Sequence, residues 1–238
     1  MCGISGIIGL QNISNPLVAS IRNLEYRGYD SCGVAVLNGR GKITVKKNIG
    51  SVDEVNEGEK LTKSKGFVGI AHTRWATHGR VTKANTHPHL SCHKEFACVH
   101  NGIISNYRAL KNLLAKKGHK FLSETDTEVI AHLLEDFYNT TGNVEKTFLK
   151  TLNKLEGTFA IAMITTFDSD RLYCAKKESP LILGIGDDAN YIGSDSNAFI
   201  DFTKNSIVLD DFEYAIVSKD SYVVKNFNQG NIIEKEIT

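Results

Sequence analysis

Short apolar runs separated by turn-forming residues make up most of the chain. The first run, residues 3 to 10, is rich in isoleucine and glycine, a pattern that predicts a central strand closely approached by other backbone. Residues 67–73 and 96–104 are also apolar and predict strands. Residues 33–50 hold two short strands joined by the turn Asn38-Gly-Arg-Gly, which predicts a hairpin.

Apolar residues at helical spacing predict four helices before residue 157. Ser14 or Asn15 could cap the first helix, with Pro16 at its first position, and this helix is expected to end near Gly28. Thr125 and Glu128 form a candidate capping box at the start of another. The other three are expected over residues 107–117, 125–138 and 144–155.

After Gly157 the pattern changes to repeated short strands separated by Gly, Asn and Asp turns. Such close spacing leaves no room for crossover helices, so it predicts antiparallel hairpins. With the helices grouped in the middle of the chain, two sheets flanked by helices are the expected layering.

Composition narrows the class of protein. The chain has 238 residues, 41% of them hydrophobic, which is enough to bury one sizeable core, so a single domain is expected. The 28 Lys and Arg nearly balance the 27 Asp and Glu, so no basic field points to nucleic acid. No apolar run is long enough to cross a bilayer, and no secretory signal begins the chain. Neither a nucleic acid nor a membrane is therefore expected as a partner.

The cysteines indicate a reducing compartment. There are five, an odd number, and none form a CxxC pair, so neither a disulfide framework nor a zinc ribbon is expected. A cytoplasmic location fits this pattern best.

Cys2 is a candidate nucleophile because of its position. If Met1 is removed, the thiol and a free α-amino group belong to one residue, and that amine has a pKa of roughly 7.7 to 8.0. The amine can then take the thiol proton, so no separate histidine base is required. The alternative is that Cys2 is a small buried hydrophobic residue at the head of a strand.

The segment AHTRWATHGR, residues 71–80, follows a predicted strand. Arg74 at the strand end could hold a carboxylate through two parallel hydrogen bonds, and Trp75 and His78 could close over a ligand. The alternative is a solvated loop with one aromatic residue packed on the core.

Two further segments allow both a structural and a chemical interpretation. In VHNGII, residues 99–104, Asn101 and the N–H of Gly102 could stabilise a negative oxygen, but an Asn-Gly pair between apolar halves favours a hairpin turn. In SETDTEVIAH, residues 123–132, the acids suit the first turn of a helix, whereas Asp126 could pair with a substrate ammonium.

The histidines raise the question of a metal. His87, His89 and His93 lie near Cys92, but this spacing matches no standard zinc site, and no metal is expected. The remaining histidines of interest are interpreted as isolated core or surface residues: His100, His119 and His132.

Five motifs taken together, in this order, closely resemble the class II glutamine amidotransferases, the N-terminal nucleophile family. They are LEYRGYDSCG (24–33), HTRWATHG (72–79), NTHPH (85–89), HNGII (100–104) and SETDTEVIAH (123–132). Within the family, residues 26–31 and 74–79 are most similar to the branch that aminates fructose 6-phosphate. A departure from the family is Cys32, where a small residue is usual.

The resemblance implies an α+β fold, a four-layer αββα sandwich of two antiparallel sheets, over a single domain of residues 2–238 with Met1 removed. It implies that Cys2 attacks the side-chain amide of L-glutamine, that its α-amino group moves the protons, and that Asn101 and Gly102 form the oxyanion hole. No cofactor is implied.

The resemblance also assigns residues to the substrate. Arg74 is implied to hold the α-carboxylate of glutamine and Asp126 its α-ammonium. The other implied members of the pocket are Trp75, Thr77 and His78, on a loop that covers glutamine, and Arg27 and Gly28, in the wall near the nucleophile.

The implied partners are L-glutamine and the sugar-isomerase domains of a full-length, homo-oligomeric enzyme that uses fructose 6-phosphate as acceptor. Those domains lie outside this sequence. Two alternatives stay open at this point. One is the glutaminase domain of another class II enzyme, similar to amidophosphoribosyltransferase, and the other is a glutamine-binding module without catalytic activity.

Overall fold

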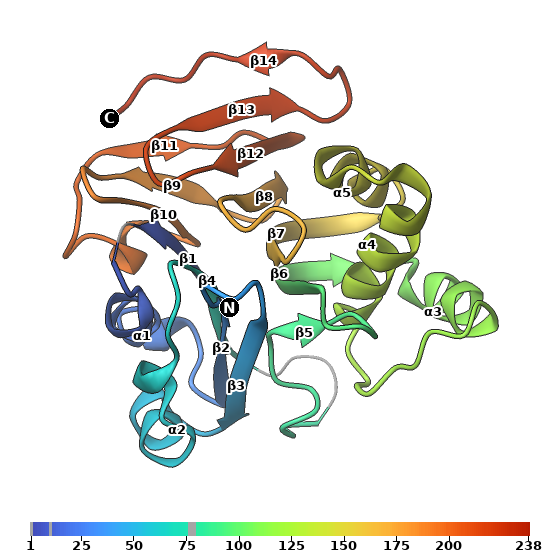
Figure 1. Cartoon of the computed structure of the whole chain (residues 1–238), viewed down its shortest axis with the longest axis horizontal. Helices are drawn as coiled ribbons and strands as arrows, with labels where there is room; N and C mark the ends of the chain where they lie inside the picture. The colour runs from blue at the N-terminus through green and yellow to red at the C-terminus, as the bar shows by residue number, and fades with distance from the viewer. Residues whose placement is uncertain (1, 10, 76–79) are drawn as a thin grey trace.

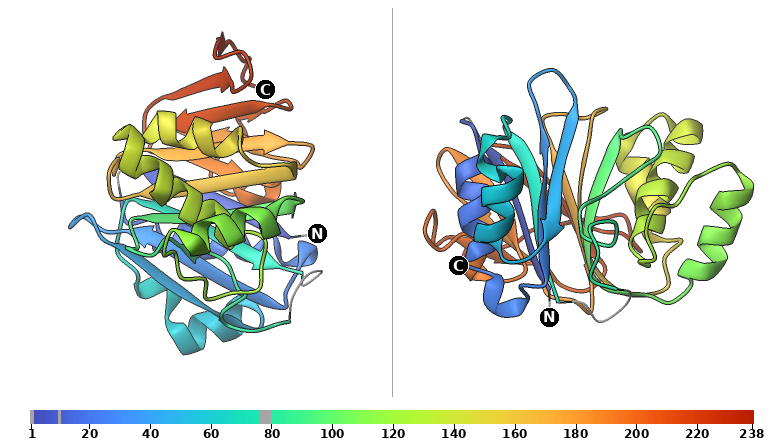
Figure 2. Two further views of the ribbon diagram at one scale, coloured as in Figure 1. Left: turned by 90° about the vertical axis from the view of Figure 1, so that its right-hand side faces the viewer. Right: turned by 90° about the horizontal axis from the view of Figure 1, so that it is seen from below.

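The chain folds into four layers, with two sheets facing each other and helices on the outer face of each (Figures 1 and 2). The computed structural model describes residues 2–9, 11–75 and 80–238. Every strand pairing in both sheets is antiparallel. This is the expected αββα sandwich of α+β class.

The first sheet has the strand order β11-β9-β10-β1-β4-β2-β3. Strand β1 is buried along its whole length between β10 and β4, as its apolar sequence predicts. Helices α1 (Ser14–Arg22) and α2 (Val52–Glu59) cover the outer face (Figure 1). The strands are β1 (Gly3–Gly9), β2 (Ser31–Leu37), β3 (Ile43–Ile49), β4 (Val68–Arg74), β9 (Ile182–Ile185), β10 (Ala189–Gly193) and β11 (Ser206–Val208).

The second sheet has the order β14-β13-β12-β8-β7-β6-β5. Its outer face carries α3 (Tyr107–Lys116), α4 (Glu128–Thr141) and α5 (Val144–Leu152) (Figure 2). No helix in the described ranges is both long enough and apolar enough to cross a bilayer. The strands are β5 (His89–Leu90), β6 (Phe96–Ile104), β7 (Gly157–Thr165), β8 (Leu172–Lys177), β12 (Glu213–Val217), β13 (Tyr222–Asn226) and β14 (Ile232–Ile233).

Alternation along the strands fills both the space between the sheets and the space under the helices. In β1, Ile4 and Ile8 pack between the two sheets, whereas Ile7 packs under α1. In β6, Val99 faces the other sheet and Cys98 packs under the helices. Because both faces are buried, these strands read as continuous apolar runs.

Several predicted helix boundaries are wrong. Helix α1 begins at Ser14, so Pro16 is not its first residue, and neither Ser14 nor Asn15 caps it. It ends at Arg22, and a separate 3₁₀ turn, Glu25–Arg27, occupies the stretch before Gly28. Helix α5 ends at Leu152, three residues before the predicted end. The capping box is absent because α4 begins only at Glu128, whose carboxylate accepts hydrogen bonds from the backbone N–H groups of Leu122 (2.8 Å) and Ser123 (2.7 Å). The Glu128 carboxylate therefore stabilises the loop before α4 and does not cap the first turn of the helix.

The hairpin turn favoured for Asn101-Gly102 is also wrong. Both residues lie inside β6 and pair with β7, where Asn101 is opposite Ala160. Gly102 has φ +125°, and a Cβ there would come within 2.1 Å of the Thr158 carbonyl oxygen, so only glycine fits. The nine-residue ladder with β7 outweighs the local turn preference, and Gly102 lies on the wall of a cavity.

Candidate active site

All five motifs supply residues to one cavity, of about 270 Å³, where the two sheets meet. Cys2 lies in it, and so do residues from the ends of β4 and β6 and from the loop before α4. The described lining residues are Cys2, Arg27, His72, Arg74, Trp75, His87, His100, Asn101, Gly102, Thr125, Asp126, Thr127, Ser179 and Pro180. Segments more than 100 residues apart in the sequence therefore form one site.

Strand pairing places the Cys2 thiol beside the end of β4. Gly3 pairs with Thr73, and the N–H of Trp75 then donates a hydrogen bond to Cys2 Sγ at 3.3 Å. Burial raises the pKa of the Cys2 thiol, although the Trp75 N–H and the charge of Arg74 act in the opposite direction. At neutral pH the thiol is therefore protonated and needs a base before it can act as a nucleophile.

The Asn101 side chain makes three hydrogen bonds, one of them to Cys2. Its Oδ1 lies 3.0 Å from His72 Nε2, while its Nδ2 donates to the carbonyl oxygen of Cys2 at 3.0 Å and to Ser194 Oγ at 3.1 Å. Ser194 Oγ also accepts from the N–H of Ile4 at 2.7 Å. These contacts fix an amide donor directly beside Cys2.

Arg74 and Asp126 place opposite charges on the walls of the same cavity. Arg74 is buried at the end of β4, and its Nη1 donates to the carbonyl oxygen of Arg80 at 3.3 Å. Asp126 is half-buried and accepts a hydrogen bond from the N–H of Ile104 at 2.8 Å. A cavity that holds a fixed cation and a fixed anion on its walls suits a zwitterionic ligand.

Arg27 and Gly28 lie next to Cys2 and Trp75 on the side of the first sheet. Arg27 Nε donates to the carbonyl oxygen of Cys2 at 3.2 Å, and its guanidinium pairs with Asp195. Gly28 is packed behind the cavity, because a Cβ at this position would lie 2.6 Å from the backbone nitrogen of Trp75. A side chain at Gly28 would thus displace the strand end that contacts Cys2.

The loop that follows β4 is only partly described. Trp75 is 45% exposed and lies edge-on to Tyr29, with ring centroids 5.8 Å apart. The predicted ligand-covering residues Thr77 and His78 lie outside the described residues.

Sequence reasoning missed the buried histidines of the site. His72 lies two positions before Arg74 on β4 and so faces the same side of the sheet, a signal that the strand pattern already contained. His87 stacks on His72 with centroids 4.1 Å apart, and His100 lines the cavity, so the interpretation of His100 as isolated is wrong. The His87 ring lies between the rings of His72 and His89, with centroids 4.1 and 4.8 Å away.

Burial of His72 predicts a loss of stability in acid. Burial lowers the pKa of His72 to about 3. Between about pH 6.5 and pH 3 the His72 imidazole is therefore protonated in the unfolded chain but neutral in the folded chain. The contribution of neutral His72 to the free energy of unfolding is complete above pH 6.5 and falls by about 1.4 kcal/mol per pH unit below pH 6.5. The test measures the free energy of unfolding in urea at pH 6, 5 and 4 for the wild type and for a His72→Gln variant. With decreasing pH this free energy is expected to fall less steeply for the variant, by that amount per pH unit. Equal pH dependence of the two proteins would contradict the assigned effect of His72.

The amino-acid sequence of the chain is similar to those of known glutamine amidotransferases. A family model described as a glutamine amidotransferase domain matches residues 72–201, more than half of the chain. The glutamine–fructose-6-phosphate aminotransferase (isomerizing) of Pyrococcus horikoshii is 46% identical over all of this chain and 40% of its own length. Those of Thermococcus kodakarensis and Aquifex aeolicus are each 47% identical, again over all of this chain and 39% of their own. The chain thus spans about two-fifths of these relatives.

Solved structures share the fold. The glutamine phosphoribosylpyrophosphate amidotransferase of B. subtilis, complexed with ADP and GMP, matches with a TM-score of 0.81 and 27% identity over 97% of this chain and 50% of its own. A structure described as the allosteric regulatory enzyme of purine biosynthesis matches with a TM-score of 0.80 and 28% identity, over 95% of this chain and 49% of its own.

Proposed function

Because the chain belongs to the glutamine amidotransferase domain family, we propose that it hydrolyses L-glutamine to L-glutamate and ammonia, with Cys2 as the nucleophile. The observation that carries the proposal is the shared cavity, which has the Cys2 thiol, the Arg74 guanidinium and the Asp126 carboxylate on its walls. Free glutamine has an amide to be attacked, a carboxylate to be held and an ammonium to be paired.

Removal of Met1 precedes the reaction and gives Cys2 a free α-amino group. This amine takes the thiol proton, and Sγ forms a bond to the side-chain carbonyl carbon of glutamine. The same proton then passes to the leaving nitrogen, the C–N bond breaks, and ammonia departs from a γ-glutamyl thioester. Water, deprotonated by the amine, attacks the thioester, and glutamate and the Cys2 thiol are released.

Asn101 Nδ2 and the N–H of Gly102 are proposed to stabilise the negative oxygen of both tetrahedral intermediates. The Asn101 amide already points at Cys2, where it donates to the Cys2 carbonyl and to Ser194 Oγ. One of these hydrogen bonds is exchanged for the substrate oxygen as the intermediate forms. His72 is a positioning residue, because its contact with Asn101 Oδ1 fixes which atom of the amide faces the nucleophile.

The wider enzyme follows from the relatives. We propose that the ammonia serves synthesis of glucosamine 6-phosphate from fructose 6-phosphate, in a cytoplasmic homo-oligomer that includes sugar-isomerase domains. Support for this branch over the phosphoribosyl branch comes from identities of 46–47% to the fructose-6-phosphate aminotransferases and 27–28% to the solved amidophosphoribosyltransferase-type structures. All five cysteines are free thiols, in keeping with a reducing compartment.

A direct test incubates the purified chain with glutamine and measures glutamate and ammonia together. The proposal predicts equal amounts of both, and labelling of the N-terminal peptide by an electrophilic glutamine analogue. Saturable glutamine binding with neither product would overturn the proposal in favour of a binding module.

Loss of the Arg74 guanidinium is expected to act on substrate binding. Arg74→Ala should raise KM for glutamine by about 100-fold, because about 2 to 3 kcal/mol of a buried charge pair with the substrate carboxylate is lost. The decisive readout is selectivity. The wild type should strongly prefer glutamine over 4-aminobutanamide, which lacks the carboxylate, and Arg74→Ala should remove most of that preference.

The matched control is Arg22→Ala, since Arg22 is an exposed arginine on α1 that pairs with Asp53 outside the cavity. It should leave both rates unchanged. An Arg74→Ala variant that keeps the full preference for glutamine, measured on protein with a native unfolding transition, would contradict the assigned role.

A further inference from the structure

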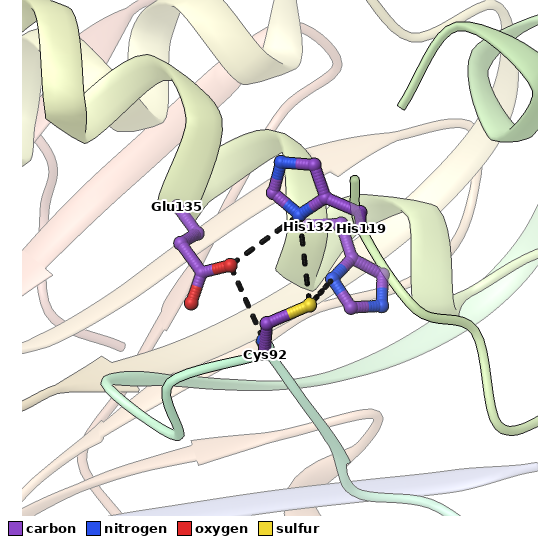
Figure 3. Close-up of side chains that lie close together, drawn as sticks. All are labelled: Cys92, His119, His132 and Glu135. Atoms are coloured by element: carbon purple, nitrogen blue, oxygen red, sulfur yellow. Dashed lines mark hydrogen bonds and ion pairs between the residues drawn. The ribbon is translucent and has the colours of Figure 1, made fainter. Parts of the chain in front are cut away.

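A second cluster of metal-binding side chains lies outside the Cys2 cavity. Cys92 lies in the turn between β5 and β6, His119 in the loop after α3, and His132 and Glu135 on α4. Figure 3 shows the four side chains pointing toward one another from these three segments. None of them lines the Cys2 cavity. The interpretation of His119 and His132 as isolated residues is therefore wrong.

Three of the distances between donor atoms match the spacing around one tetrahedral ion. Cys92 Sγ lies 3.8 Å from His119 Nδ1 and 3.6 Å from His132 Nδ1, and His119 Nδ1 lies 3.3 Å from Glu135 Oε2. Zinc bonds of about 2.3 Å to sulfur and about 2.1 Å to nitrogen and oxygen, at tetrahedral angles, separate sulfur from nitrogen by about 3.6 Å and nitrogen from oxygen by about 3.4 Å. All four donor atoms lie within 4.8 Å of one another.

Both histidines present Nδ1 to the cluster. Their Nε2 atoms lie near carboxylates but beyond hydrogen-bond distance, with His132 Nε2 3.6 Å from Glu128 Oε1 and His119 Nε2 3.9 Å from Asp136 Oδ1. Among the described residues, buried His132 Nε2 has no hydrogen-bond partner. His132 and Glu135 are three residues apart on α4 and so share one face of the helix.

The thiol of Cys92 is placed for exchange with solvent. Cys92 is exposed, whereas His132 and Glu135 on α4 are buried, so an ion could enter past the Cys92 sulfur and reach the two buried side chains. The backbone N–H of Lys120 lies 3.4 Å from Cys92 Sγ, where it would stabilise a thiolate.

We propose that Cys92, His119, His132 and Glu135 form a four-coordinate Zn²⁺ site. One thiolate, two imidazoles and one carboxylate are a donor set typical of zinc. Binding releases the thiol proton of Cys92 and forms one Zn–S, two Zn–N and one Zn–O bond, with no change of oxidation state. The ion ties the β5–β6 turn and the loop after α3 to α4. That loop continues to Asp126, so the site stabilises the segment that carries the proposed ammonium ligand.

The test measures Zn²⁺ binding by the metal-free chain. The titration uses a Cys2→Ala background, because a free N-terminal cysteine is itself a zinc chelator. We expect one Zn²⁺ per chain with a Kd of about 1 µM or tighter, and a higher Tm with Zn²⁺ than with chelator. Co²⁺ in place of Zn²⁺ should give a thiolate charge-transfer band and the strong visible bands of a tetrahedral site.

Two variants distinguish this site from its neighbourhood. Cys92→Ser should weaken Zn²⁺ binding by more than about 100-fold and remove the Co²⁺ charge-transfer band, since loss of a second-layer partner alone costs about 10- to 100-fold. His93→Gln is the matched control. His93 follows Cys92 and contacts Glu135 through Nδ1 at 3.1 Å, but it is not among the four ligands. Its variant should therefore lose no more than the about 10- to 100-fold of a second-layer partner, and less than Cys92→Ser loses.

Three results would overturn the proposal. The first is no stoichiometric binding by the Cys2→Ala chain, which would leave the cluster as a hydrogen-bonded network. The second is unchanged binding by Cys92→Ser. The third is a loss in His93→Gln as large as that in Cys92→Ser, which would assign the metal to the neighbouring group of His93, Glu95 and Glu135.

Discussion

Replacing Cys2 by alanine is expected to lower glutamine hydrolysis by about 10⁴-fold or more, because the reaction loses its nucleophile and no thioester can form. Glutamine should still bind, since Arg74 and Asp126 are untouched. Single-turnover glutamate release and a glutamine-binding titration on the same preparation separate the two effects.

The control for this prediction is a second thiol. Cys32→Ala removes a buried cysteine from β2, whose pKa is raised to about 12 by burial and by the nearby Glu25. This thiol packs under α1 and α2 and does not line the cavity, so its loss should leave hydrolysis nearly unchanged. Hydrolysis by Cys2→Ala within 100-fold of the wild type would contradict the assignment of the nucleophile.

Loss of the Asn101 amide is expected to lower kcat by about 10²- to 10³-fold with little change in KM. The proposed hydrogen bond to the substrate oxygen is strongest in the tetrahedral intermediate, so its removal costs about 2.7 to 4 kcal/mol of barrier and little ground-state binding. Steady-state kinetics of Asn101→Ala provide the measurement.

Asn106→Ala is the matched control for Asn101. Asn106 follows the same strand, but its amide donates to the carbonyl oxygen of Lys154, and it does not line the cavity. The oxyanion role would be contradicted if Asn101→Ala raised KM and left kcat unchanged, or if both asparagine variants lost the same activity.

The layered fold could be predicted because its signals are local and repeated. Apolar strands buried on both faces, such as β1, and closely spaced hairpins after Gly157 both appear in the structure. The family predicted from the motifs is confirmed by the match to glutamine amidotransferase domains over residues 72–201. Arg74, Asn101 and Asp126 line one cavity with Cys2, as their shared family assignment predicts.

The features that could not be predicted from the sequence depend on contacts between segments that are distant along the chain. Asn101-Gly102 has the composition of a turn, and only the ladder with β7 keeps it in a strand. Glu128 has the spacing of a capping residue, but its carboxylate accepts hydrogen bonds from the backbone N–H groups of residues 122 and 123 instead. Cys92 and His132 are 40 positions apart, so no local motif indicates that Sγ and Nδ1 lie 3.6 Å apart.

The central claim is that Cys2 carries its own base, and the N-terminus tests it most directly. The measurement compares glutamine hydrolysis by a chain that intact mass shows to begin at Cys2 with hydrolysis by a variant that keeps one extra residue before Cys2. We predict that the first chain is active and that the extended chain, whose thiol is present but whose α-amine is displaced, loses nearly all activity. Full activity in the extended chain would contradict the account.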